Sequence, residues 1–181
     1  MDHALIRISK FLSLVLRHRP EVIGMTLDAE GWLDINALIA NANRHGHAIT
    51  LQQFHDVVAD NDKQRFALSD DGMRIRANQG HSIRHVDLDL PVVRPPTHLY
   101  HGTVIQFLAS IRAQGLLTRS RNHVHLSADR EAARKVGMRR GDPVVLTIAA
   151  GQMHSVGRRF YCSANGVWLT DAVPPEYIVF P

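Results

Sequence analysis

Cysteine is scarce in this 181-residue chain, in which Cys162 is the only example. A single cysteine excludes an internal disulfide and any CxxC redox or zinc pair, and it fits a reducing compartment. Long hydrophobic runs are also missing, since none approaches the roughly 18–20 apolar residues that cross a bilayer. The N-terminus lacks the order of charged, apolar and small residues that marks a signal peptide. We therefore expect a cytoplasmic protein without a membrane partner.

Several motifs of nucleotide and hydrolase chemistry are missing as well. Neither GxGxxG nor GxxxxGK(S/T) occurs, so a bound nucleotide would use neither a Rossmann turn nor a P-loop. There is no GxSxG elbow, and Cys162 lies in an expected strand with no base beside it. The twelve histidines include His123 and His125 on one face of an expected strand, but no further ligand lies at a recognisable zinc spacing. We therefore expect no metal.

The composition is that of a globular protein with a basic surface. Hydrophobic residues make up 45% of the chain, which suffices for a buried core in one domain or in two small ones. The formal net charge is +4 and the pI is about 9.7. This excess favours a polyanionic partner, although charge alone does not choose between RNA, DNA and a membrane surface.

The first third of the chain predicts three helices. Apolar spacing predicts an amphipathic helix over 4–18, which Pro20 ends. Asp34 and Thr50 are expected to cap the next two helices, because each carries a side-chain oxygen just before a run of helical periodicity. Short extended pieces are expected on either side of the turn at 28–31, at 25–27 and 31–33.

A β-hairpin follows these helices. The segments 65–68 and 73–76 alternate apolar and polar residues on either side of a turn that contains Gly72. Arg74 and Arg76 are two residues apart on the second strand, so they are expected to share one face. The order of helix, short strand, helix, helix and hairpin is typical of a winged-helix module, which usually binds nucleic acid.

Residues 86–97 are rich in proline, which suits a linker and not a helix. We therefore predict an N-terminal domain at 1–90, a linker at 91–97 and a second domain at 98–181. In the second domain, strands are expected at 99–102, 123–127, 143–148, 160–162, 167–169 and 177–180. Helices are expected at 105–115, with Thr103 as its N-cap, and at 129–136. Strands dominate, so the expected fold class is α+β.

A polar stretch from Arg76 to Ser82 carries a guanidinium, an amide, an imidazole and a hydroxyl, without a long hydrophobic side chain. Its donors suit a phosphate or a polar nucleotide, and the alternative is a solvated exit from the hairpin. Arg17 with His18, Arg76, and Arg139 form three separate basic foci. Convergent guanidinium groups would bind a phosphate dianion, whereas each one taken singly is an ordinary surface charge.

Five short strings follow one another along the chain: LRHRP at 16–20, RANQGHS at 76–82, LYHGT at 99–103, HVHLS at 123–127 and NGVWLT at 165–170. Together they closely resemble the RNA 2′-phosphotransferases of the KptA family, in order and over nearly the whole chain. The resemblance implies an N-terminal winged-helix lobe that binds RNA and a C-terminal ADP-ribosyltransferase-like lobe that binds NAD.

The resemblance also implies a reaction. Members of this family transfer an internal 2′-phosphate of RNA, as left by tRNA splicing, to NAD through an RNA whose 2′-phosphate is ADP-ribosylated. The products are RNA with a free 2′-hydroxyl, ADP-ribose 1″,2″-cyclic phosphate and nicotinamide. NAD is consumed as a co-substrate, no metal is needed, and the chain is expected to act as a monomer.

The catalytic set of the family falls on Arg17, His18, Arg76 and Arg139, and Arg140 is the alternative to Arg139. The NAD-binding positions carry over to Gln79, Gly80, His81, Ser82, His101, Gly102, Thr103, His125, Leu126, Ser127 and Val167. Related transferases can carry a glutamate at the position of Val167, and an apolar residue fits a nucleophile that is already anionic. Ala164 stands where the family often has a glutamate.

Two other functions stay open at the level of the sequence. One is an ADP-ribosyltransferase that modifies nucleic-acid or protein termini. The other is a non-enzymatic winged-helix regulator whose C-terminal half senses NAD.

Overall fold

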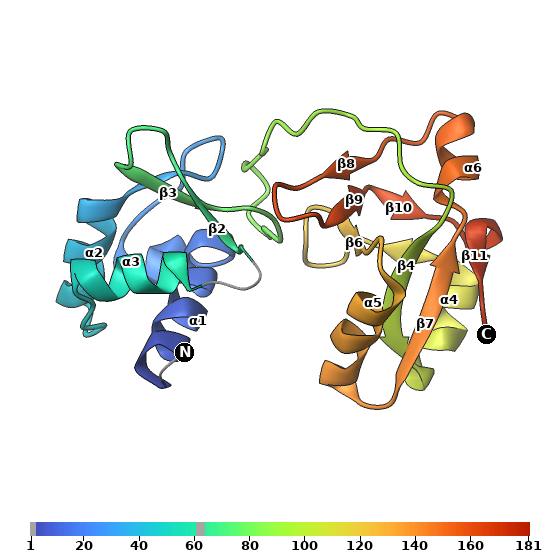
Figure 1. The fold of residues 1–181 in the computed structure, drawn as a ribbon, viewed down its shortest axis with the longest axis horizontal. Helices are drawn as coiled ribbons and strands as arrows, with labels where there is room; N and C mark the ends of the chain where they lie inside the picture. Colours follow the sequence, from blue (N-terminus) through green and yellow to red (C-terminus); the bar gives the residue numbers. More distant parts are fainter. Residues whose placement is uncertain (1–2, 61–63) are drawn as a thin grey trace. The chain divides into compact units, whose positions relative to one another are not determined.

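The structure is a computed structural model that describes residues 3–60 and 64–181. The chain divides into two compact units, Met1–Asp89 and Leu90–Pro181, each with its own hydrophobic core (Figure 1). They are called the first and the second unit below, and each is described by itself.

Three α-helices and one 3-10 helix form the helical part of the first unit. They are α1 (His3–Arg17), η1 (Pro20–Ile23), α2 (Ile35–Arg44) and α3 (Leu51–Ala59). The predicted caps are confirmed: the Asp34 side chain accepts a hydrogen bond from the Ala37 N–H at 2.7 Å. Thr50 and Gln53 form a complete capping box, in which each side chain bonds the backbone N–H of the other.

A small antiparallel sheet completes the first unit. It contains β1 (Leu33–Asp34), β2 (Phe66–Leu68) and β3 (Arg74–Ala77) in the order β1-β3-β2. The helices lie together along one side of this sheet (Figure 1). The predicted hairpin is therefore confirmed, and its second strand is the central one of the sheet.

The core of the first unit joins the inner faces of these elements. Leu12 and Leu16 of α1, Leu38 of α2, Phe54 of α3 and Ile75 of β3 are all fully buried. The apolar stripes that predicted the helices therefore face one common core.

The strands of the second unit are short and antiparallel. They are β4 (Leu99–Val104), β5 (Leu116–Leu117), β6 (Val124–Leu126), β7 (Pro143–Ile148), β8 (Tyr161–Cys162), β9 (Trp168–Thr170), β10 (Ala172–Val173) and β11 (Ile178–Val179). They form the sheets β11-β7-β4, β6-β9-β8 and β10-β5. The helices are η2 (Ile105–Phe107), α4 (Leu108–Gln114), α5 (Arg130–Gly137), η3 (Met138–Arg140), α6 (Ala150–Ser155) and η4 (Pro175–Tyr177).

The α+β class is confirmed, because the chain contains both helices and strands and every strand pair in the described ranges is antiparallel. Local predictions need correction at Thr103 and at residues 25–33. Thr103 does not cap a helix, since β4 continues through it to Val104. No strand forms at 25–27, and β1 begins only at Leu33. The sequence also gave no sign of α6, nor of the pair β5 and β10.

The proline-rich segment is part of the second unit. Val92 forms a β-bridge with Tyr161, and the Val93 N–H donates to the Phe160 carbonyl at 2.8 Å. Thr97 accepts a hydrogen bond from the Gly151 N–H at 3.1 Å. The predicted linker at 91–97 is therefore bonded to the second unit along its length.

Within the described parts of the chain, no helix combines the length and the apolar character that a bilayer crossing needs.

The capping box of α3 predicts a specific loss of stability. Thr50→Ala removes the acceptor for the Gln53 N–H, and α3 carries the fully buried Phe54. We expect the free energy of unfolding to fall by about 1 kcal/mol, measured by urea denaturation. Thr50→Ser is the matched control, because it keeps the hydroxyl. Equal losses in the two variants would contradict this account.

Candidate active site

The segment that follows β3 contacts the C-terminus of α1. Arg17 is the last residue of α1 and His18 follows it, with the His18 N–H donating to the Leu14 carbonyl at 3.0 Å. The Ser82 N–H donates to the Arg17 carbonyl at 2.9 Å, and Ser82 Oγ lies 3.0 Å from His18 Nδ1. The segment after β3 is thus bonded to the helix end that carries both basic side chains.

The backbone of that segment is shaped by Gly80. Its φ is +91°, a conformation in which residues other than glycine are strained. A Cβ on Gly80 would also lie 3.6 Å from Cδ and Nη1 of Arg17. Just before it, the buried Asn78 donates from its backbone to the Arg65 carbonyl and from its side chain to the Gln64 carbonyl. The side chain of Arg17 therefore lies along Gly80, whose preceding residue, Gln79, is half-buried.

His81 lies inside the first unit with 4% of its surface exposed. Burial, followed by the charges of Arg17, His18 and Arg76, lowers its pKa to about 4. Its Nε2 atom is buried without a hydrogen-bond partner among the described residues, and a Cβ on Gly31 would lie 3.1 Å from it. The imidazole is therefore neutral near pH 7, and it is enclosed by protein instead of being presented at a surface.

Arg76 belongs to the same cluster. It shares a face of β3 with Arg74, as predicted, since both guanidinium groups lie over the Trp32 ring, at 4.5 and 5.4 Å from its centroid. Arg17, His18 and Arg76 are all close enough to His81 to lower its pKa. The structure thus brings three of the four predicted catalytic residues together, and the fourth, Arg139, lies in the second unit.

The predicted string His101–Thr103 lies in β4 of the second unit. Gly102 pairs with Val145 of β7, and α5 packs directly against it. A Cβ at Gly102 would overlap the Ala133 carbonyl oxygen of α5. Glycine is therefore required here for packing, whatever else the position does.

Three histidines of the second unit form a chain of hydrogen bonds to carbonyls. His101 Nδ1 lies 3.1 Å from the His125 carbonyl oxygen, and His125 Nδ1 lies 3.0 Å from that of His123. Burial lowers the pKa of His101, the bond to the His125 carbonyl opposes this, and the charges of Arg140 and Arg121 add to the lowering. A neutral His101 donates from Nδ1, which leaves Nε2 as an acceptor.

The other predicted positions of the second unit lie on adjoining strands. His125 and Leu126 are in β6, which pairs with Leu169 and Trp168 of β9. Ser127 forms a backbone bridge with Tyr100 of β4, which joins the predicted strings 99–103 and 123–127. Val167 lies just before β9, and its N–H and carbonyl both bond Ser163.

Arg139 and Arg140 lie in η3, where the Arg140 guanidinium is 5.8 Å from the Phe107 ring centroid. Arg121 is a third arginine of this group, which the sequence analysis missed. Its pKa is lowered by partial burial first and then by Arg140 and Arg139, although part of its surface stays exposed. In the part of the chain that the structure describes, no carboxylate forms an ion pair with these three arginines. In the sequence, the one feature that pointed to Arg121 as a candidate residue is its position shortly before the HVHLS string.

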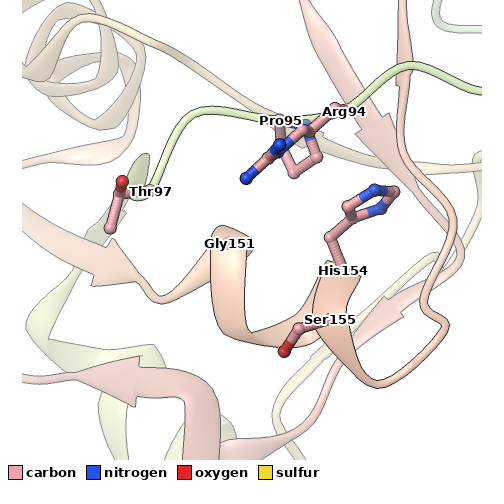
Figure 2. A pocket seen from close by; sticks show the side chains of 6 residues that line it. All are labelled: Arg94, Pro95, Thr97, Gly151, His154 and Ser155. Atoms are coloured by element: carbon pink, nitrogen blue, oxygen red, sulfur yellow. The ribbon is translucent and has the colours of Figure 1, made fainter.

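A separate cavity of about 370 Å³ lies in the second unit. It is lined by Arg94, Pro95, Thr97, Gly151, His154 and Ser155 (Figure 2). Figure 2 shows the last three on α6 and the others on the segment that runs past this helix. None of the predicted site residues lines this cavity. Among the described residues, no group of three or more His, Cys, Asp or Glu side chains could hold a metal ion.

Comparison with known proteins gives the class of the molecule. The sequence model of the family "RNA 2′-phosphotransferase, Tpt1 / KptA family" matches residues 3–172, and the chain therefore belongs to this family. A protein of Rhodopirellula baltica is 63% identical over 99% of this chain and 98% of its own length. One of Hahella chejuensis is 58% identical over 98% of this chain and 95% of its own. Both are named "Probable RNA 2′-phosphotransferase".

Buried His81 predicts a pH dependence of stability. Its folded pKa of about 4 is below the ordinary value of 6.5, so between these values only the unfolded chain binds the proton. Stability therefore falls as the pH falls through this window, by up to about 1.4 kcal/mol per pH unit. Urea titrations at pH 5, 6 and 7 should show that His81→Gln, which cannot titrate, loses less stability than the unaltered chain. Identical pH dependence in both proteins would contradict the burial of a neutral imidazole.

Proposed function

We propose that this protein transfers an internal 2′-phosphate from RNA to NAD, giving 2′-hydroxyl RNA, ADP-ribose 1″,2″-cyclic phosphate and nicotinamide. Membership of the RNA 2′-phosphotransferase family supports the phosphate transfer. The observation that carries the residue assignment is the gathering of Arg17, His18 and Arg76 around the neutral His81. Three cationic or titratable side chains beside one uncharged imidazole are suited to a phosphate dianion.

In the first step, an oxygen of the RNA 2′-phosphate forms a bond to C1″ of the nicotinamide ribose. The bond from C1″ to the nicotinamide nitrogen breaks, and nicotinamide leaves with the electron pair. We assign Arg17 and Arg76 to holding the phosphate, because a fixed guanidinium fork removes much of the entropy cost of alignment.

In the second step, the ribose 2″-hydroxyl loses its proton and attacks phosphorus, and the bond from phosphorus to the RNA 2′-oxygen breaks. That oxygen takes a proton and becomes the free hydroxyl. The extra negative charge on phosphorus is stabilised by the arginines, among them Arg139. His18 is assigned to the proton or to the phosphate, and the Ser82 hydroxyl at 3.0 Å from its Nδ1 supports a fixed ring.

We assign the NAD-binding role in the second unit to His101, Gly102, Thr103, His125, Leu126, Ser127 and Val167. Two observations support this fit. A neutral His101 offers an acceptor for a ribose hydroxyl. The arginines of η3 and Arg121 offer positive charge, and no carboxylate of residues 3–60 or 64–181 forms an ion pair with them. NAD supplies the electrophilic carbon and the leaving group.

The loop residues Gln79, Gly80, His81 and Ser82 are also predicted to contact NAD. The contacts of three of them favour an indirect role: Ser82 bonds Arg17 and His18, Gly80 lies along Arg17, and His81 is buried. We therefore propose that these three act mainly by positioning Arg17 and His18.

The finer fold assignments belong to the same proposal. The three helices and three-stranded sheet of the first unit support a winged-helix lobe that binds RNA. The antiparallel sheets of the second unit support an ADP-ribosyltransferase-like lobe. The monomeric state and the cytoplasmic location stay predictions from the sequence.

One assay tests the function directly. The protein is incubated with NAD and a short RNA that carries one internal 2′-phosphate, and the RNA and nucleotide products are analysed. We expect 2′-hydroxyl RNA and ADP-ribose 1″,2″-cyclic phosphate in equal amounts. Accumulation of ADP-ribosylated RNA alone would favour a terminal ADP-ribosyltransferase instead. Binding of NAD without release of nicotinamide would favour a non-enzymatic regulator.

The two arginines of β3 provide a matched pair of variants. Arg76→Ala is expected to cost at least about 2–3 kcal/mol of transition-state stabilisation, the scale for one preorganised charge contact. Arg74 is the neighbouring cation on the same face and is not assigned to the catalytic set. Arg74→Ala should therefore change the transition-state stabilisation, derived from kcat/KM, by no more than about 0.5 kcal/mol. Steady-state kinetics with the 2′-phosphorylated RNA measure both. Near-normal turnover of Arg76→Ala would remove Arg76 from the catalytic set.

A further inference from the structure

The turn from Asp28 to Trp32 is held firmly by its own hydrogen bonds. Asp28 Oδ1 accepts from the N–H groups of Glu30 at 3.0 Å and Trp32 at 2.8 Å. The Asp28 N–H donates to the Trp32 carbonyl at 3.2 Å, and Gly31 has a φ of +82°. The directions in which Glu30 and Trp32 leave the turn are therefore fixed by the backbone.

Strand pairing brings this turn to Arg76. Leu33 of β1 pairs with Ile75 of β3, and Asp34 pairs with Arg74. Extending this antiparallel register by one residue places Trp32 opposite Arg76. The contact is observed, since the Arg76 guanidinium carbon lies 4.5 Å from the Trp32 ring centroid.

Glu30 closes the arrangement. Its Oε2 lies 3.7 Å from Nη1 of Arg76 and accepts a hydrogen bond from Nε1 of Trp32 at 3.4 Å. The side chain of Arg76 is 23% exposed and that of Glu30 is 60% exposed. The guanidinium is thus partly enclosed, while its carboxylate partner stands mostly in water.

These contacts use different parts of the guanidinium. An aromatic ring attracts a cation through its face, and tryptophan does so most strongly. A ring below the guanidinium leaves the in-plane N–H groups available to an anion, and it restricts the rotamers of a long side chain. An exposed ion pair is weak, so a phosphate dianion can take the place of the Glu30 carboxylate.

We propose that Trp32 is a positioning residue that fixes Arg76 for phosphate, and that Glu30 is the counter-ion that the RNA phosphate displaces. This inference rests on the proposed role of Arg76 in the transfer reaction. It assigns roles to two residues that lie outside the five strings of the resemblance.

Kinetics of Trp32 variants test the positioning role. Trp32→Ala should lower kcat on the order of ten-fold, because the cation–π contact is lost and the guanidinium becomes free to rotate. Trp32→Phe keeps an aromatic face and should recover most of that loss. Trp32→Leu is the control, because leucine fills space without an aromatic face and should recover little of it. Recovery by leucine equal to that by phenylalanine, or an unchanged kcat in Trp32→Ala, would overturn the proposal.

Glu30→Gln tests the counter-ion role. Glutamine can still accept the Trp32 N–H but carries no charge, so the phosphate no longer competes with a carboxylate. We expect the KM for the 2′-phosphorylated RNA to fall several-fold with kcat little changed, and the difference to shrink in high salt. A raised KM would show that the carboxylate assists binding, which would overturn this part.

A readout other than activity separates this inference from the proposed function. The chain has two tryptophans, so Trp168→Phe leaves Trp32 as the only one. In that background, Arg76→Ala should change the Trp32 emission more than Arg74→Ala, whose guanidinium lies farther from the ring at 5.4 Å. Adding 2′-phosphorylated RNA should shift the emission only when Arg76 is present. An unresponsive Trp32 in a protein that transfers phosphate would refute the positioning role alone, and a responsive Trp32 in a protein without transferase activity would refute the function alone.

Discussion

The site in the first unit depends on the hydrogen bond from the Ser82 N–H to the Arg17 carbonyl. The last carbonyls of a helix have no partner within it, and this one is satisfied by a residue 65 positions further along the chain. The same serine contacts the His18 ring at 3.0 Å. These bonds join the end of α1 to the segment after β3, and the contact with Ser82 restrains the His18 ring.

Close cations repel each other, and the first unit reduces this cost in two ways. The His81 imidazole is buried and neutral, so it adds no further charge to the cluster. Arg76 is offset by the aromatic face of Trp32 and by the exposed carboxylate of Glu30. These contacts lower the electrostatic cost of placing the cations together. Local rules of stability and solubility are most often broken where a ligand completes the site.

Local chemistry made much of the fold predictable, while tertiary pairing decided the rest. Asp34 and Thr50 act as caps because the bonds they make lie within one turn. Thr103 carries the same kind of signal, but pairing of β4 with β7 through this position overrides it. The strands β5 and β10 exist only through each other, by pairing Leu117 with Ala172. In the site, charge pointed to Arg17 and Arg76, but neither the burial of His81 nor the proximity of Arg121 to η3 can be read from neighbours in sequence.

The two units use the same physical device around their candidate residues. In each, burial lowers the pKa of a histidine that lies near arginines: His81 near Arg17 and Arg76, and His101 near Arg121 and Arg140. A protonated imidazole at either position would add to the repulsion and would lose its acceptor nitrogen. Neutral, it leaves the positive charge on guanidinium groups, which stay protonated at any physiological pH. The positive charge around these two positions is then insensitive to pH near neutrality.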